Sequence, residues 1–143
     1  MRWSVLQKQH RGFENQMNPF HPYSADWAAA YTKESWIFEN KDFEALIITD
    51  INQKILWVNN GFTEMTGYSK KFALNKTPNF LQGEATETTT RKRIRTKLEH
   101  LKPFTEVIVN YRKDNTPYKC EVKIIPLYKE KVTHFLAIEK KVV

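Results

Sequence analysis

Alternating apolar and polar positions predict a pair of strands in the first half of the chain. Residues 45–49 and 54–58 are apolar runs rich in β-branched side chains, and the polar stretch from Asp50 to Gln53 separates them. Two such runs around a short polar turn are typical of a β-hairpin. We therefore expect two antiparallel strands here, with Asp50 used in the chemistry of the turn.

Apolar residues at helical spacing predict a long helix over residues 86–101. Ile94, Leu98 and Leu101 recur at intervals of four and three, so they form one apolar stripe. Pro103 follows and ends the helix. Shorter helical pieces are expected before it: one that begins at Asn59 or Asn60 and ends near Gly67, and others around Pro78.

An amphipathic helix is also predicted near the N-terminus, over about residues 25–38. Ser24 can cap it, and Trp27 and Tyr31 belong to its apolar face. The residues before it contain two prolines in the stretch NPFHPY, which argues against a helix there.

The last third of the chain has the alternation of β-strands. We expect strands over residues 104–112, 116–126 and 132–140, with a turn at residues 113–115. Strands and helices are thus grouped separately along the chain. That arrangement predicts an α+β fold with an antiparallel sheet.

Composition narrows the class of protein without identifying it. The chain has 143 residues, enough for one domain, and a single cysteine, which excludes a disulfide framework and a thiolate-rich metal site. Neither an apolar run of membrane-span length nor a signal peptide is evident, so a cytoplasmic protein is expected. The net charge of +7 is concentrated in residues 91–143, which hold 14 basic and 6 acidic side chains. Such a region attracts nucleic acid or an acidic partner, or is simply solvated.

Several motifs resemble one family. The stretch IITDINQKILWVNNGFTEMTGYS resembles the opening of PAS sensor domains, and NFLQGEATETTTRKRIR and NYRKDNTPY resemble the light-oxygen-voltage (LOV) branch of that family. The resemblance implies a PAS domain over residues 41–143, with residues 1–40 as an N-terminal extension. It further implies a five-stranded antiparallel sheet with helices on one face, and a cavity that holds flavin mononucleotide (FMN).

The resemblance also assigns cofactor positions, and this chain keeps only some of them. LOV domains join a cysteine of the motif GxNCRFLQ to the flavin, but the chain reads NKTPNFLQ, with Pro78 in the cysteine position. Proline has no thiol, so the usual photoadduct cannot form there. The other matched positions, some with substituted residues, are Thr77, Asn79, Gln82, Arg95, Asn110, Cys120 and Glu139.

The chemistry of these residues suits a flavin in part. Gln82 and Asn110 can bond the polar edge of the ring, and Arg95 with Arg91 one helical turn earlier can bind the phosphate. Glu139 stands where a Gln is expected. An ionised Glu139 has only hydrogen-bond acceptors, so it cannot donate to the flavin carbonyls. It can donate only when its carboxyl is protonated, which requires a raised pKa.

Single residues offer a few other functions. Cys120 could replace the missing thiol from another strand, although a small buried side chain is the commoner role. His134 could ligate a haem, and the basic half could bind nucleic acid, although no nucleic-acid-binding motif accompanies it. No catalytic constellation and no metal-ligand spacing are present, so we expect neither catalysis nor a bound metal.

The outer face of the predicted sheet suggests an interface. If Asn110 and Glu139 face the cavity, strand alternation points their neighbours outward: Val107, Val109, Tyr111, Leu136 and Ile138. Exposed together, these would form a large apolar patch, which the helix at 25–38, through Trp27 and Tyr31, can cover within one chain or across a dimer.

The sequence therefore predicts a PAS module that senses a signal or binds a protein, as a homodimer or with a signalling partner. It would work without cysteinyl-flavin photochemistry, and a small molecule could occupy its cavity. The alternative is a flavin-binding photoreceptor or redox sensor that works without the usual adduct.

Overall fold

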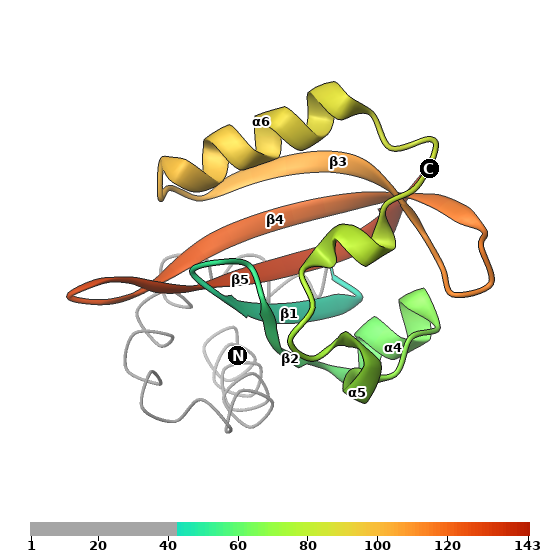
Figure 1. The fold of residues 1–143 in the computed structure, drawn as a ribbon, viewed down its shortest axis with the longest axis horizontal. Coiled ribbons are helices and arrows are strands. Elements are labelled where there is room, and N and C mark those ends of the chain that lie inside the picture. The colour runs from blue at the N-terminus through green and yellow to red at the C-terminus, as the bar shows by residue number, and fades with distance from the viewer. Residues whose placement is uncertain (1–42) are drawn as a thin grey trace, which may run out of the picture.

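The computed structural model describes residues 43–143, whose centre is one five-stranded antiparallel sheet. Its strands are β1 (Ala45–Asp50), β2 (Ile55–Val58), β3 (Phe104–Tyr111), β4 (Pro117–Lys129) and β5 (Lys131–Val142). Their order across the sheet is β2-β1-β5-β4-β3 (Figure 1). The predicted α+β class and five-stranded sheet are confirmed. The predicted helix at 25–38 and the extension 1–40 lie outside the described residues.

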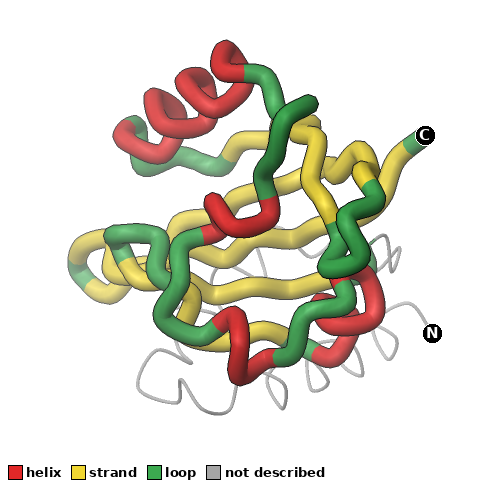
Figure 2. Tube along the Cα trace, turned by 45° about the vertical axis from the view of Figure 1, so that its right-hand side comes forward, coloured by secondary structure: helices red, strands yellow, loops and turns green. Residues whose placement is uncertain are grey.

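Four helical segments lie between β2 and β3 in the chain. They are α4 (Asn60–Thr66), α5 (Lys70–Ala73), the 3-10 helix η2 (Pro78–Leu81) and α6 (Thr88–Glu99). All four lie on the same face of the sheet, as Figure 2 shows. Gly67 ends α4 with φ 81, a left-handed conformation that glycine adopts without strain. The expected short helices are thus confirmed.

The first hairpin turns where the sequence predicts. Asp50 Oδ1 accepts hydrogen bonds from the backbone N–H groups of Asn52 and Lys54, both at 2.9 Å. Gln53 closes the turn with φ 64. The carboxylate therefore takes over backbone hydrogen bonds that the turn would otherwise leave to water.

Asn59 joins α4 to the sheet. Its Oδ1 accepts from Phe62 N–H at 3.0 Å, which caps α4, and from Leu46 N–H at 2.9 Å, which belongs to β1. Its own N–H donates to Leu46 O at 3.1 Å. This junction brings Gly61, in the first turn of α4, against the backbone carbonyl of Glu44.

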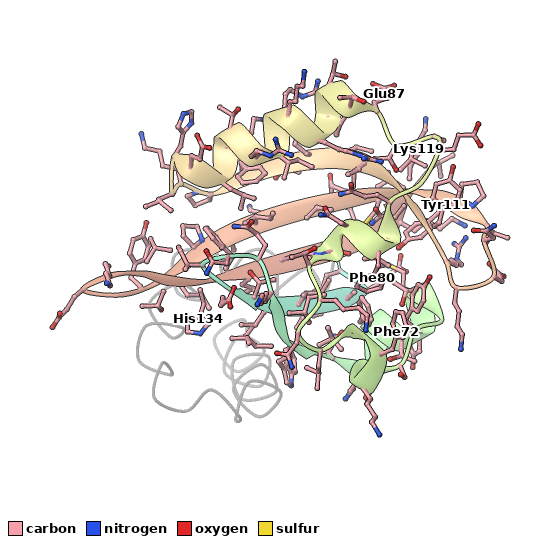
Figure 3. All side chains as sticks on the ribbon, in the orientation of Figure 1. Phe72, Phe80, Glu87, Tyr111, Lys119 and His134 are labelled. Atoms are coloured by element: carbon pink, nitrogen blue, oxygen red, sulfur yellow. The ribbon has the colours of Figure 1, made fainter. Side chains whose placement is uncertain are left out.

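An aromatic cluster packs the short helices together. Phe72 and Phe80 lie close to each other below η2 in Figure 3, with ring centroids 5.5 Å apart. Tyr68 stacks on Phe72 at 4.8 Å and meets Phe80 edge to face at 5.1 Å. These contacts hold the segment that precedes Gln82 against the sheet.

The long helix is shorter than predicted at both ends. Thr86 lies before it, because its Oγ1 accepts from Gly83 N–H at 3.0 Å and donates to Val109 O at 2.6 Å. Leu101 lies past the helix end at His100, with φ 55, and is exposed. The apolar stripe on the helix therefore consists of Ile94 and Leu98 alone.

Ion pairs attach α6 to β3. Lys97 Nζ lies 2.6 Å and Arg93 Nε 3.3 Å from Glu106 Oε2. The hydrogen bond from Lys97 is the main reason that the pKa of Glu106 falls below its ordinary value. The Glu106 side chain is only 11% exposed, so these pairs are less screened than those on an open surface.

Candidate functional site

A cavity of about 510 Å³ lies between the inner face of the sheet, η2 and α6. This volume falls in the usual range for small-molecule sites. Apolar side chains from four strands, from η2 and from α6 form much of its wall: Ile47, Leu81, Ile94, Leu98, Ile108, Val122, Ile124, Phe135 and Ala137. The cavity is therefore a site for a ligand with substantial apolar surface.

The segment around η2 supplies one polar wall. Thr77, Pro78, Asn79 and Gln82 all line the cavity. Pro78 is the first residue of η2, where a missing N–H costs nothing. The structure thus gathers the four positions that the sequence singled out here, and it places a proline ring where LOV domains are expected to carry a thiol.

Helix α6 supplies the cationic wall. Arg91 and Arg95, one turn apart, both line the cavity, and Arg91 Nη2 donates to Gly83 O at 3.3 Å. Within the part of the chain that the structure describes, Arg91 Nε is buried without a hydrogen-bond partner. A buried guanidinium N–H without an acceptor is unfavourable, so this side chain is suited to bind an anion that enters the cavity.

The sheet supplies two buried polar side chains. Asn110 on β3 and Glu139 on β5 line the cavity, and Glu139 is 5% exposed. Their positions follow from the register, which pairs Asn110 with Tyr118 and Glu139 with Val122. Both therefore face inward, as the family resemblance implies.

Cys120 lies beneath the cavity and is not among the residues that line it. Its buried thiol donates to Glu139 Oε1 at 3.6 Å and to Glu121 O at 3.8 Å. Burial, followed by the charge of Glu139, raises the pKa of the thiol far above its ordinary value. The thiolate is the reactive form, so this environment disfavours nucleophilic reaction of Cys120.

Glu139 is also strongly affected by burial. Loss of solvation raises the pKa of its carboxyl to about 7, and the Cys120 hydrogen bond opposes this only in part. A carboxyl of this kind is largely protonated just below neutral pH. In that form it is a hydrogen-bond donor as well as an acceptor.

The structure divides the predicted interface residues into different environments. Leu136 and Ile138 lie on the outer face and are buried, whereas Val107 is 46% exposed and Val109 is half-buried. Trp27 and Tyr31, which were expected to cover this face, lie outside the described residues.

Tyr111 contacts the loop that leads to α6 (Figure 3). Its hydroxyl accepts from Ala85 N–H at 2.8 Å, and its ring leaves no room for a side chain at Gly83. The sequence placed Tyr111 in the interface, and strand alternation alone gave no indication of this contact.

His134 is on the opposite face from the cavity. It pairs in register with Asp50, whereas its neighbour Phe135 lines the cavity. A haem in this cavity would not be ligated by His134. Over residues 43–143, His, Cys, Asp and Glu side chains form no group of three or more that could hold a metal ion. In the same region, no helix has the length and apolar character of a membrane span.

Several lining residues are not among the predicted site residues, and Gln53, Thr49 and Phe135 are three of them. Thr49 and Phe135 are register partners on adjacent strands. Strand alternation from Glu139 would have found Phe135, four residues earlier on the same face. Gln53 belongs to the first hairpin turn, and no sequence period places a turn residue at a cavity.

Sheet, helices and internal cavity together have the architecture of the sensory domains called PAS domains. The family model for the PAS domain matches residues 44–140, and the chain belongs to the PAS domain family. A blue-light photoreceptor of Listeria monocytogenes is 38% identical over 101 residues, which are 68% of this chain and 40% of that protein. Blue-light-activated histidine kinase 2 of Erythrobacter litoralis is 31% identical over 116 residues, 78% of this chain and 33% of that protein.

Comparison with solved structures also shows similarity to LOV domains. The LOV domain from the Erythrobacter litoralis EL346 blue-light activated histidine kinase has a TM-score of 0.66 and 31% identity, covering 70% of this chain and 95% of that one. The resemblance to LOV domains is thus confirmed. The chain spans less than half the length of the curated relatives described above.

Proposed function

We propose that this PAS domain is a sensor whose cavity binds FMN, and that it works without a cysteinyl-flavin adduct. The observation that carries the proposal is the cavity itself. Its apolar body suits a flat aromatic ring, Gln82 and Asn110 can bond the polar ring edge, and the α6 arginines can bind a phosphate. When bound, a flavin supplies absorption of blue light and the capacity to take up electrons.

The residues present fit this cofactor. The unpartnered Arg91 Nε is an anion-binding group that the protein alone leaves without an acceptor. Arg95 is exposed at the wall of the same cavity, so it can meet a phosphate that reaches solvent. Similarity to blue-light photoreceptors supports the same cofactor class.

The position of the single thiol opposes formation of an adduct. Cys120 is the single cysteine, and its protonated sulfur faces Glu139 from below the cavity wall. Pro78 stands at the cavity wall in the position that the LOV motif gives to cysteine. A signal would then depend on the redox state or occupancy of the flavin and on the hydrogen bonds that Gln82, Asn110 and Glu139 make to it.

An absorbance spectrum and a binding titration test the cofactor. The purified chain, incubated with FMN, should show resolved flavin bands. Arg91→Ala should weaken FMN binding about 30-fold, because a charge-assisted contact to the phosphate is lost. Lys92→Ala, the adjacent exposed cation on α6, is the control and should change the dissociation constant less than about twofold. A chain that binds no FMN, or that binds it equally well without Arg91, contradicts the proposal.

The signal passes through the outer face of the sheet to a second copy of this chain. Val107, which is 46% exposed on the outer side of β3, is the side chain through which we expect the two copies to meet. Sedimentation equilibrium should give a dimer, and Val107→Lys should weaken its association by about tenfold or more, because a charge enters an apolar contact. Lys92→Ala should leave the dimer unchanged. A monomer at every protein concentration would contradict this part of the proposal.

A further inference from the structure

The carboxyl of Glu139 is buried in the cavity wall with little to balance a negative charge. Among the described residues its one side-chain hydrogen-bond partner is the Cys120 thiol, at 3.6 Å. Thiols are weak donors, so this contact compensates an ionised carboxylate poorly. The other carboxyl lone pairs are left for whatever occupies the cavity.

The elements packed around Glu139 carry few groups that could balance a negative charge on its carboxyl. Glu44 precedes β1, and its backbone N–H donates to Glu139 O at 2.8 Å, so a second carboxylate lies near Glu139 in space. The Glu44 Oε1 atom accepts from Lys141 N–H at 3.1 Å. The groups from β4 and α6 that titrate or carry charge in this part of the domain are Cys120, Tyr118, Arg91 and Arg95. Burial keeps the thiol and the phenol protonated, and Arg91 is directed to the Gly83 carbonyl.

We propose that Glu139 holds the ligand as a neutral acid, donating a hydrogen bond to a carbonyl of the flavin ring, and that its ionisation releases the ligand. The inference rests on the proposed function, because it names how the flavin site is regulated. It also specifies the ligand class: a ring that presents a hydrogen-bond acceptor to β5. An ionised carboxylate offers that acceptor only lone pairs, so the contact turns from attractive to repulsive.

Occupancy of the cavity then depends on pH near neutrality. In the ligand-free domain the carboxyl has a pKa of about 7. If only the neutral acid binds, the dissociation constant should rise about tenfold for each pH unit above that value. The cavity would fill in a mildly acidic cell and empty in an alkaline one.

The test is a fluorescence titration of the full chain with riboflavin at a series of pH values. Riboflavin lacks the phosphate of FMN, so no ligand phosphate titrates during the series. Between about pH 6 and about pH 8.5, binding should weaken about 30-fold in the natural chain. Glu139→Gln keeps a donor that cannot ionise, and its affinity should be independent of pH over that range.

A matched carboxyl separates Glu139 from general charge effects. Glu121 lies on the other face of β4 and pairs with Lys140 at 3.4 Å. Glu121→Gln should therefore keep the full pH dependence. If the natural chain binds riboflavin equally well across the series, or if Glu139→Gln keeps the slope, the inference is overturned while the flavin proposal stands. If neither riboflavin nor FMN binds at any pH, both are overturned.

Discussion

Gly61→Ala should lower the free energy of unfolding by about 3 kcal/mol, one of the largest effects of any conservative change in this domain. A methyl group at this position would overlap the backbone carbonyl of Glu44. Backbone cannot rotate away as a side chain can. Here the start of α4 is also fixed to β1, because Asn59 bonds the Leu46 backbone through both its side chain and its own N–H.

Urea unfolding monitored by circular dichroism measures this effect. Gly67→Ala is the matched control: it places the same methyl group in a left-handed conformation with φ 81, where the nearest atom, Lys113 Cβ, lies 3.3 Å away and no backbone carbonyl overlaps the new methyl group. Its cost should be about 1 to 2 kcal/mol. Equal losses from the two variants would show that α4 can shift away from β1, contrary to the junction described here.

Glu139→Gln should make the folded domain more stable above neutral pH, by about 3 kcal/mol. The pKa of this carboxyl is raised from 4.5 to about 7 in the folded state. Between these values the unfolded chain loses its proton and the folded chain keeps it, so the stability of the natural chain falls as the pH rises. Below the lower value both states are protonated, and above about 7 both are ionised and the loss is complete.

Unfolding curves at about pH 4.5, 6 and 8 test whether the stability of the natural chain falls as the pH rises. The difference between Glu139→Gln and the natural chain should be smallest at the lowest pH and largest at the highest. Glu121→Gln, on the outer face, should show no such growth. A natural chain that gains stability relative to Glu139→Gln as the pH rises would mean that the buried carboxylate has an uncounted cation beside it.

The spacing of apolar residues and the residue types of the turns predicted most of the fold from the sequence. The resemblance to LOV domains placed Asn110 and Glu139 at the cavity, and the spacing of Ile94 and Leu98 predicted the apolar stripe of α6; all four residues line the cavity. The predicted start of the long helix was wrong because a side chain there bonds a residue far away in the sequence. Thr86 was assigned to a helix, but its hydroxyl bonds Val109 O across 23 residues.

The Cys120–Glu139 contact could not be predicted either, although both residues were named. It depends on the register of β4 and β5, in which Cys120 pairs with Lys141 and Val122 pairs with Glu139. The two side chains are thus diagonal neighbours on one face. A slip of one residue in that register would have moved one of them to the opposite face.

The two outer strands of the sheet constrain how copies of this domain can meet. On β2, the backbone of Ile55 already bonds Lys76 O at 2.9 Å and Asn75 N–H at 2.8 Å. On β3, the Val109 carbonyl is taken by Thr86 at 2.6 Å. An incoming strand needs free backbone groups along an edge, and at these positions they are already used. These occupied groups oppose the addition of another strand at Ile55 and at Val109, and so work against growth into a continuous intermolecular sheet.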